Sequence, residues 1–255
     1  MSTRRPLRRL AAVLLLAACA AASRRAPAAR AQTPRVLVFS KTAGFRHASI
    51  PAGVAAVTRL GREHGFAVDA TEDAGAFTDS LLGRYRAVVF LSTTGDVLDA
   101  RQQAALERYV AAGGGWVGVH SATDTEYDWP WYGRLAGAYF AGHPGNPNVR
   151  RATLRVRDST HAATRGLPAR WEREDEFYNF RSIQPDLHVL VDIDERTYQG
   201  GTNGPDHPMA WSHAVGRDRA FYTALGHTEA SYAEPAFLGH LLGGIQWAMG
   251  ARPPE

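Results

Sequence analysis

Residues 113–125 read GGGWVGVHSATDT: a glycine-rich start, a short apolar run and a polar ending. An apolar run of this length, bounded by glycines and turn-forming residues, is typical of a strand that is buried on both faces of a sheet. The stretch therefore predicts a buried strand over 116–119. His120 and Ser121 then lie at the carboxyl end of that strand, and Asp124 follows closely.

Helical patterns separate this strand from three similar apolar runs that precede it, at residues 36–39, 66–68 and 87–91. One helix is expected over 51–64, with Ser49 as its N-cap. Another is expected over 100–112, where Asp99 and Gln102 have the spacing of a capping box. Strands that alternate with helices predict a mainly parallel α/β sheet with helices on both faces.

The second half of the chain has shorter and less regular apolar segments. Alternating patterns there predict strands over 152–156, 188–191, 209–213 and 220–223. The last two flank a turn at 216–218 and predict a hairpin, and a closing helix is expected over 235–249. We therefore expect an antiparallel extension of the parallel sheet.

The residues before position 32 are predicted to be an export signal that lies outside the fold. Paired arginines precede an apolar run over 10–22, which is too short to span a membrane as a permanent helix. Residues 29–31 fit ordinary cleavage by a signal peptidase. Residues 16–19 instead resemble a bacterial lipobox, which would leave Cys19 lipidated. Residues 3–7 also resemble a twin-arginine signal. We expect a single domain over 32–255 that is exported to the periplasm or beyond, with membrane contact only through an anchor at Cys19.

Charge and cysteine content exclude several classes of function. The chain has 29 Lys and Arg against 25 Asp and Glu, but seven of the arginines lie in the expected export signal. The remaining domain is slightly acidic, so the main support for nucleic-acid binding disappears. Cys19 is the only cysteine. The domain beyond it therefore has no disulfide, no cysteine nucleophile and no thiolate metal site.

Several predicted strands end at residues with catalytic or metal-binding chemistry. His47 lies in the loop after the first strand, His120 and Asp124 follow the fourth, and His227 follows the last. Ligands of open α/β sheets bind beyond the carboxyl ends of the strands, so these side chains are expected to converge. We predict that they act as acid, base or catalytic ligands, with His47, His120 and His227 as candidate ligands of a divalent metal.

Further polar residues are candidates for the same site. His143 lies beside turn residues, and Glu174 and Glu176 fall in a polar segment that suits a cleft better than a buried strand. The opposing interpretation is that histidines at strand ends are packed, hydrogen-bonded residues. No HExxH or other tight metal-binding spacing is present to exclude it.

A carbohydrate ligand is suggested by aromatic residues that are predicted to lie outside strands, near the mouth of the site: Tyr127, Trp129, Trp131, Tyr132, Phe177, Tyr178 and Phe180. Sugar rings stack on such side chains. The alternative is that these rings form a small satellite core beneath long loops. Together with charged residues near the same sheet edge, the predicted substrate-binding residues are Lys41, Arg46, Trp131, His143, Glu176 and Tyr178.

Ser121 follows a buried strand and precedes small residues, as a serine nucleophile does. The G-x-S-x-G pattern of a nucleophile elbow is absent, because the local sequence is VHSAT. Its neighbour His120 would point elsewhere, which disfavours a serine–histidine pair. Ser121 remains a candidate catalytic residue without a predicted role as nucleophile.

Motifs along the chain resemble those of the ThuA-like, or trehalose-utilisation, family. They are VLVFSKTAGFRHASI, GGGWVGVHSATDT, YFAGHP, DEFYNF, HPMAWSHAVGRDRAFYTALGHT and FLGHLLGGIQWAMG, and they span residues 34–250 in the expected order. The resemblance implies a flavodoxin-like fold of the class I glutamine amidotransferase type and a link to bacterial disaccharide use, including sugars oxidised at the 3-position. The site residues that it implies are His47, His120, Ser121, Asp124, His143 and His227.

The resemblance also limits the chemistry. Glutamine amidotransferases carry a cysteine nucleophile at the corresponding elbow, and this domain has none, so amide transfer is excluded. We expect an enzyme that acts on a disaccharide or 3-keto-glycoside, as a lyase or hydrolase, through histidine and carboxylate groups as acid and base, either with a divalent metal or without a cofactor. The alternative is a non-catalytic module on the same fold that binds carbohydrate or a protein partner.

Overall fold

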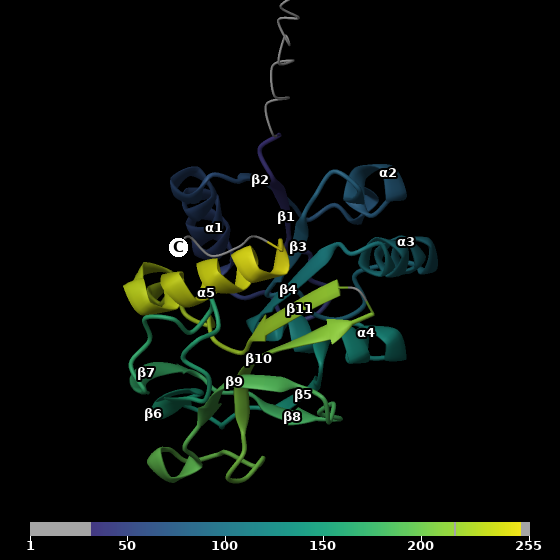
Figure 1. The fold of residues 1–255 in the computed structure, drawn as a ribbon. Helices are drawn as coiled ribbons and strands as arrows, with labels where there is room; N and C mark the ends of the chain where they lie inside the picture. Colours follow the sequence, from purple (N-terminus) through teal and green to yellow (C-terminus); the bar gives the residue numbers. More distant parts are fainter. Residues whose placement is uncertain (1–31, 217, 251–255) are drawn as a thin grey trace, which may run out of the picture. The chain divides into compact units, whose positions relative to one another are not determined.

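A nine-stranded mixed sheet organises the computed structural model, which describes residues 32–216 and 218–250. The predicted export signal, with Cys19, lies outside the described residues, as does Arg217 in the predicted hairpin turn. The strand order is β2-β1-β3-β4-β11-β10-β9-β6-β7 (Figure 1). Within the described part of the chain, none of the helices has the length and apolar character that crossing a membrane requires.

The first half of the sheet is parallel, as predicted. It consists of β1 (Arg35–Phe39), β2 (Ala67–Thr71), β3 (Ala87–Leu91), β4 (Gly115–Val119) and the later strand β11 (Asp218–Thr223). The order β2-β1-β3-β4 followed by one more parallel strand is that of flavodoxin-like folds. The side chains of β3 and β4 are buried throughout, which explains their continuous apolar sequences.

The second half is antiparallel, which confirms the predicted extension. It consists of β10 (Pro208–Val215), β9 (His188–Ile193), β6 (Val149–Val156) and β7 (Arg170–Glu176), and a separate pair is formed by β5 (Tyr139–Gly142) and β8 (Asn179–Arg181). The segment around Glu174, predicted to suit a polar cleft better than a buried strand, is a strand, and Glu176 at its end lines a cavity. In β7, Glu172 and Glu174 are exposed, whereas Arg173 and Asp175 are buried. The alternation is present, but two of its inward residues are charged, so hydrophobicity does not show it.

Helices cover both faces of the sheet (Figure 1). On one side α1 (Ile50–His64) contacts α5 (Pro235–Ala248), and on the other α2 (Asp79–Leu82) contacts α3 (Ala100–Ala111), with α4 (Pro130–Ala136) packed near β11. The predicted capping box of α3 is formed, because Asp99 accepts from the backbone while Gln102 accepts from the Asp99 N–H. Short 3₁₀ helices occur at Ala74–Ala76, His120–Thr123, Glu195–Thr197 and Glu229–Ala233.

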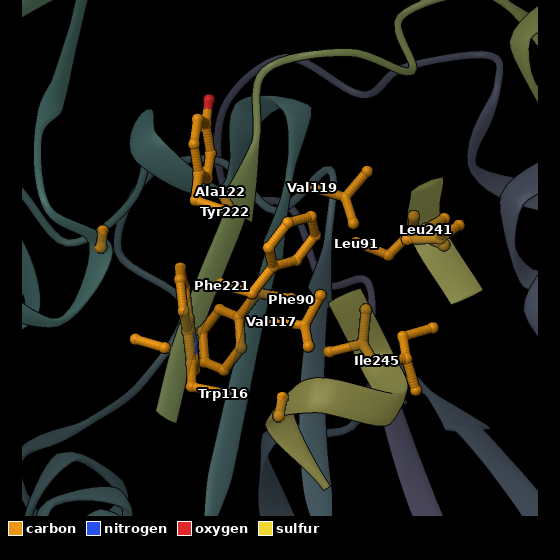
Figure 2. Packing of buried hydrophobic residues seen from close by; sticks show 14 of the residues in the cluster. Phe90, Leu91, Trp116, Val117, Val119, Ala122, Phe221, Tyr222, Leu241 and Ile245 are labelled. Carbon is orange, nitrogen blue, oxygen red and sulfur yellow. The ribbon is translucent and has the colours of Figure 1, made fainter. Parts of the chain in front are cut away.

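Alternate side chains of the central strands fill the two sides of the core (Figure 2). Val117 and Val119 of β4 lie on the side from which α5 contributes Leu241 and Ile245, whereas Trp116 points to the opposite side. All of these side chains are at most 1% exposed. Burial of this kind contributes about 1.5–3 kcal/mol per large apolar side chain and holds the carboxyl end of β4 firmly in place. The loops that follow the strands therefore start from rigid positions.

Candidate functional site

His120 occupies a strained position directly after β4. Its φ is +52°, in the left-handed region that a residue with a Cβ adopts at a cost of about 1–3 kcal/mol. Two contacts hold it there: Nδ1 lies 2.8 Å from the carbonyl oxygen of Ala224, and the Tyr222 hydroxyl donates to the His120 carbonyl at 2.6 Å. Because a carbonyl only accepts, Nδ1 carries a proton, and Nε2 faces the site.

Two further histidines meet His120 at Nε2. His47, from the loop after β1, brings its Nε2 to 3.1 Å from His120 Nε2, and His227, from the loop after β11, brings its Nδ1 to 3.1 Å from the same atom. The three loops are far apart in sequence, yet each leaves the carboxyl end of a parallel strand. The predicted convergence of the three histidines is therefore observed.

Glu176 completes the group at the end of β7. Its Oε2 lies 3.0 Å from His227 Nδ1 and 3.3 Å from His120 Nε2. In the sheet order β7 lies four positions beyond β11. Asp175, the residue before Glu176, links β7 to the loop after β11. Asp175 accepts hydrogen bonds from the backbone N–H groups of Gly226 and His227 at 2.9 and 3.0 Å. We call His47, His120, Glu176 and His227 the histidine–glutamate cluster.

Asp175 itself is held by buried groups. Its Oδ2 accepts from the Arg173 guanidinium at 2.9 Å and from the Ser231 hydroxyl at 3.3 Å, and the carboxylate is fully buried. The Arg173 guanidinium also pairs with Glu234 and lies over the rings of Trp171 and Phe237. A buried carboxylate with this many donors fixes the loop that carries His227 relative to β7.

The charge states of the cluster differ from those of free side chains. Burial, and after it the neighbouring His120 and His227, lowers the pKa of His47 to about 3. Burial acts to raise the pKa of Glu176, but the hydrogen-bonding imidazoles of His120 and His227 outweigh it and hold this pKa well below its ordinary value. Burial acts to lower the pKa of His227, yet the Glu176 carboxylate outweighs it and raises this pKa. The cluster therefore combines a neutral imidazole with an ionised carboxylate, as metal ligands require.

The donor atoms of the cluster have the spacing of a metal coordination shell. One ligand atom from each residue lies within 4.8 Å of all the others. Ligand atoms about 2.0–2.1 Å from a tetrahedral metal lie about 3.3 Å from one another. The four shortest separations in the cluster, 3.0 to 3.3 Å, are close to that value. Three imidazoles and a carboxylate suit a divalent transition metal such as Zn²⁺.

A cavity of about 390 Å³ opens onto the cluster. Three cluster residues reach it, whereas His120 lies behind them and is fully buried. The complete lining is Phe45, His47, Asp124, Phe140, His143, Asn148, Glu176, Tyr178 and His227. A volume of this size lies in the lower range of small-molecule sites.

Asp124 is the carboxylate of the cavity that lies outside the cluster. The Tyr127 hydroxyl donates to its Oδ1 at 2.6 Å. Burial raises the pKa of Asp124, and the hydrogen bond from Tyr127 partly offsets this. A carboxyl group with a raised pKa at the wall of a cavity is suited to proton transfer.

The second oxygen of Glu176 has its own partners. The Asn148 amide donates to Oε1, and His143 Nδ1 lies 3.5 Å from the same atom. His143 Nδ1 also lies 2.9 Å from the carbonyl oxygen of Pro144. These residues orient the Glu176 carboxylate so that Oε2 faces the cluster.

Other predicted site residues lie outside the cavity lining. Ser121 is fully buried behind the site, where its hydroxyl lies 3.3 Å from His47 Nδ1 and orients that ring. Lys41 donates to the carbonyl of Val97 at 2.8 Å, and Arg46 pairs with the exposed Glu72. Trp131 stacks on Trp129 at 5.0 Å on the surface of α4.

Sequence reasoning missed other parts of the site. Glu176 was predicted for substrate binding and as one of three carboxylates that could join the histidines at a metal, without being singled out, and neither Phe45, Phe140 nor Asn148 was predicted. Of the aromatic residues predicted near the mouth, Tyr178 lines the cavity, whereas Tyr132, Phe177 and Phe180 belong to the core. The alternative of a packed core therefore holds for most of these rings.

Comparisons with known proteins agree with this architecture. A ThuA-like protein of Bacteroides uniformis superposes with a TM-score of 0.72 at 23% identity, covering 88% of this chain and 95% of that one. A ThuA-like protein of Parabacteroides merdae gives 0.71 at 21% identity, covering 88% and 93%. A protein of Thermoplasma acidophilum described as a GMP synthase subunit gives 0.50 at 12% identity, covering 86% and 97%. At these identities the superpositions show a shared fold.

No curated protein matches the sequence. The family model for ThuA, described as trehalose utilisation, matches residues 35–248, nearly all of the described chain. This match includes every residue of the histidine–glutamate cluster and of the cavity lining. The chain therefore belongs to the ThuA trehalose-utilisation family.

Proposed function

We propose that this chain is a metal-dependent enzyme that cleaves a disaccharide or a 3-keto-glycoside at the cavity beside the histidine–glutamate cluster. The family supports carbohydrate utilisation as the general role. The spacing of four ligand atoms supports a divalent metal. A cavity with a carboxylate of raised pKa and aromatic walls supports a sugar substrate.

The proposed reaction is an elimination from a glycoside that carries a ketone at C3. The ketone acidifies the C–H bond at C2, next to the glycosidic carbon. A base takes this proton, the C–H electrons form a C1=C2 double bond, and the C1–O bond breaks. The departing oxygen takes up a proton, so the products are an unsaturated keto sugar and a free alcohol. A divalent metal held by the cluster would supply Lewis-acid polarisation of the ketone oxygen, if it accepted that oxygen in addition to its protein ligands.

Asp124 is the proposed base. It lines the cavity, and its raised pKa makes the ionised form a stronger proton acceptor than an ordinary carboxylate. The Tyr127 hydroxyl holds one oxygen and leaves the other for the substrate. After the first transfer, the protonated Asp124 returns its proton to the departing oxygen.

The observation that carries the proposal is the meeting of His47, His120, His227 and Glu176 beside a cavity that also contains Asp124. The test is turnover of trehalose and of 3-keto-trehalose by the purified protein, before and after removal of metal with a chelator. We expect turnover that stops without metal, returns with it, and is lost in Asp124→Asn. Binding of these sugars without turnover would instead favour the non-catalytic module.

A further inference from the structure

Phe45 is an exposed apolar residue at the mouth of the cavity. Its side chain is 67% exposed, and within residues 32–216 and 218–250 the other exposed large hydrophobic residue is Ile183, at 38%. Phe45 lines the cavity, whereas Ile183 lies in a surface loop outside it. An exposed phenylalanine forgoes the stabilisation that its burial would provide. Its position beside the cavity therefore points to a ligand.

The backbone around Phe45 is fixed. The N–H of Ala43 donates to the carbonyl of Thr94 at 2.7 Å, and the N–H of Gly44 lies 3.2 Å from the Thr94 hydroxyl. That hydroxyl donates to the carbonyl of Phe45 at 2.8 Å. Thr94, in the loop after β3, thus bonds to the backbone of three successive residues of the loop after β1. The backbone that carries the exposed ring is therefore fixed before any ligand arrives.

The ring of Phe45 stands next to the cluster. Its centroid lies 4.9 Å from that of the His47 imidazole, and the two planes are nearly perpendicular at 83°. Deeper in the site, Phe140 and Tyr178 contact each other at 4.3 Å, and Tyr178 lies against His120 at the same distance. The site therefore has an inner aromatic wall beside the cluster and an outer aromatic ring at its mouth.

We propose that Phe45 forms a subsite for the leaving-group sugar of a two-ring substrate. This inference rests on the proposed function. The reacting ring must reach Asp124 and the cluster, so the second ring of a disaccharide extends toward the mouth. Sugar rings present an apolar face of C–H groups that stacks on aromatic rings. Phe45 offers no side-chain hydrogen-bond donor or acceptor, so the subsite recognises a neutral ring by shape and tolerates different hydroxyl patterns.

The test compares two substrates that share the reacting ring. 3-Keto-trehalose has a glucose leaving group, whereas methyl 3-keto-α-glucopyranoside has methanol. In Phe45→Ala we expect kcat/KM for 3-keto-trehalose to fall about tenfold, the effect of losing one stacking contact, with kcat/KM for the methyl glycoside unchanged. Phe45→Tyr should keep the wild-type ratio of kcat/KM between the two substrates. The control Ile183→Ala should leave kcat/KM unchanged for both.

Other outcomes separate the subsite from the proposed function. Equal losses on both substrates, or no loss on either, overturn the subsite while the enzyme assignment stands. A change in oligomeric state on size-exclusion chromatography of Phe45→Ala, with selectivity unchanged, overturns it in favour of contact with a second copy of the chain. A wild-type protein that turns over neither keto-glycoside overturns the proposed function and the subsite together.

Discussion

His120 Nε2 and Glu176 Oε2 lie 3.3 Å apart, although His120 follows β4 in the middle of the sheet and Glu176 ends the edge strand β7. Nδ1 of His120 faces the Ala224 carbonyl, which fixes the ring so that Nε2 faces Glu176. The contact is a hydrogen bond when Nε2 carries a proton, and under the proposed function a divalent metal would take the place of that proton.

The left-handed backbone at His120 predicts an unusual order of stability between two variants. His120→Ala and His120→Gly both remove the imidazole and are expected to abolish metal binding. At φ +52° glycine is unstrained and alanine is not, so His120→Gly should be more stable than His120→Ala by about 1 kcal/mol. Urea unfolding of both variants measures this difference, and an alanine variant of equal or greater stability would contradict the strain.

Asp175 is predicted to position His227 without touching the substrate. Asp175→Asn places an amide N–H₂ group among N–H donors and leaves Arg173 with a weaker partner. We expect a loss of about 2–4 kcal/mol in the free energy of unfolding. Among chains that remain folded, metal affinity should also fall. Glu174→Gln changes an exposed neighbour on the same strand and should alter stability by less than about 0.5 kcal/mol.

Metal affinity is predicted to rise with pH. Glu176 raises the pKa of His227 above its ordinary value of 6.5, so below that raised pKa a proton must leave His227 before Nδ1 binds a metal. His47 has no proton to lose on metal binding well above pH 3, because its pKa is lowered to about 3. One released proton corresponds to an affinity that falls about tenfold for each pH unit of acidification below the raised pKa. Zn²⁺ titrations at a series of pH values test this, and a flat profile would refute it.

Tyr127 is predicted to lower the pKa of Asp124, the proposed base. Its hydroxyl stabilises the ionised form of Asp124 and so partly offsets the rise in pKa that burial causes. Tyr127→Phe removes the hydrogen bond, raises the pKa of Asp124 further and should move the acidic limb of the kcat/KM profile to higher pH. The position of this limb is the readout. An unchanged limb in an active variant would mean that Asp124 is not the base.

The parallel half of the fold was predictable because its strands are buried on both faces. The runs at 36–39, 87–91 and 116–119 are apolar and are separated by amphipathic helices. The predicted capping box of α3 formed, whereas Ser49 makes no side-chain cap hydrogen bond to α1. The edge strand β7 was not predictable in this way. Two of its inward residues, Arg173 and Asp175, are charged and pair with each other, and Asp175 also bonds to the loop after β11. Trp171 is then the one apolar residue of the alternation, and no apolar period marks the strand.

The three histidines of the site were predictable from topology, because parallel strands bring their carboxyl ends to one edge. The sequence left Glu176 as one of three candidate carboxylates, with Asp124 and Glu174, since its approach depends on how the antiparallel half of the sheet returns toward β11. Lys41 and Arg46 lie in the expected loop but bond to other partners, which sequence position does not reveal. Phe45 carried no signal in the sequence, because its importance comes from its exposure.

The central claim is that His47, His120, His227 and Glu176 together hold one divalent metal. The most direct measurement is a calorimetric titration of the metal-depleted protein with Zn²⁺, for the wild type, Glu176→Gln and the control Glu174→Gln. The account predicts one ion per chain, an affinity at least about tenfold weaker in Glu176→Gln, and no change in Glu174→Gln. A wild type that binds no Zn²⁺, or a Glu176→Gln variant that binds it as tightly as the wild type, would contradict the account.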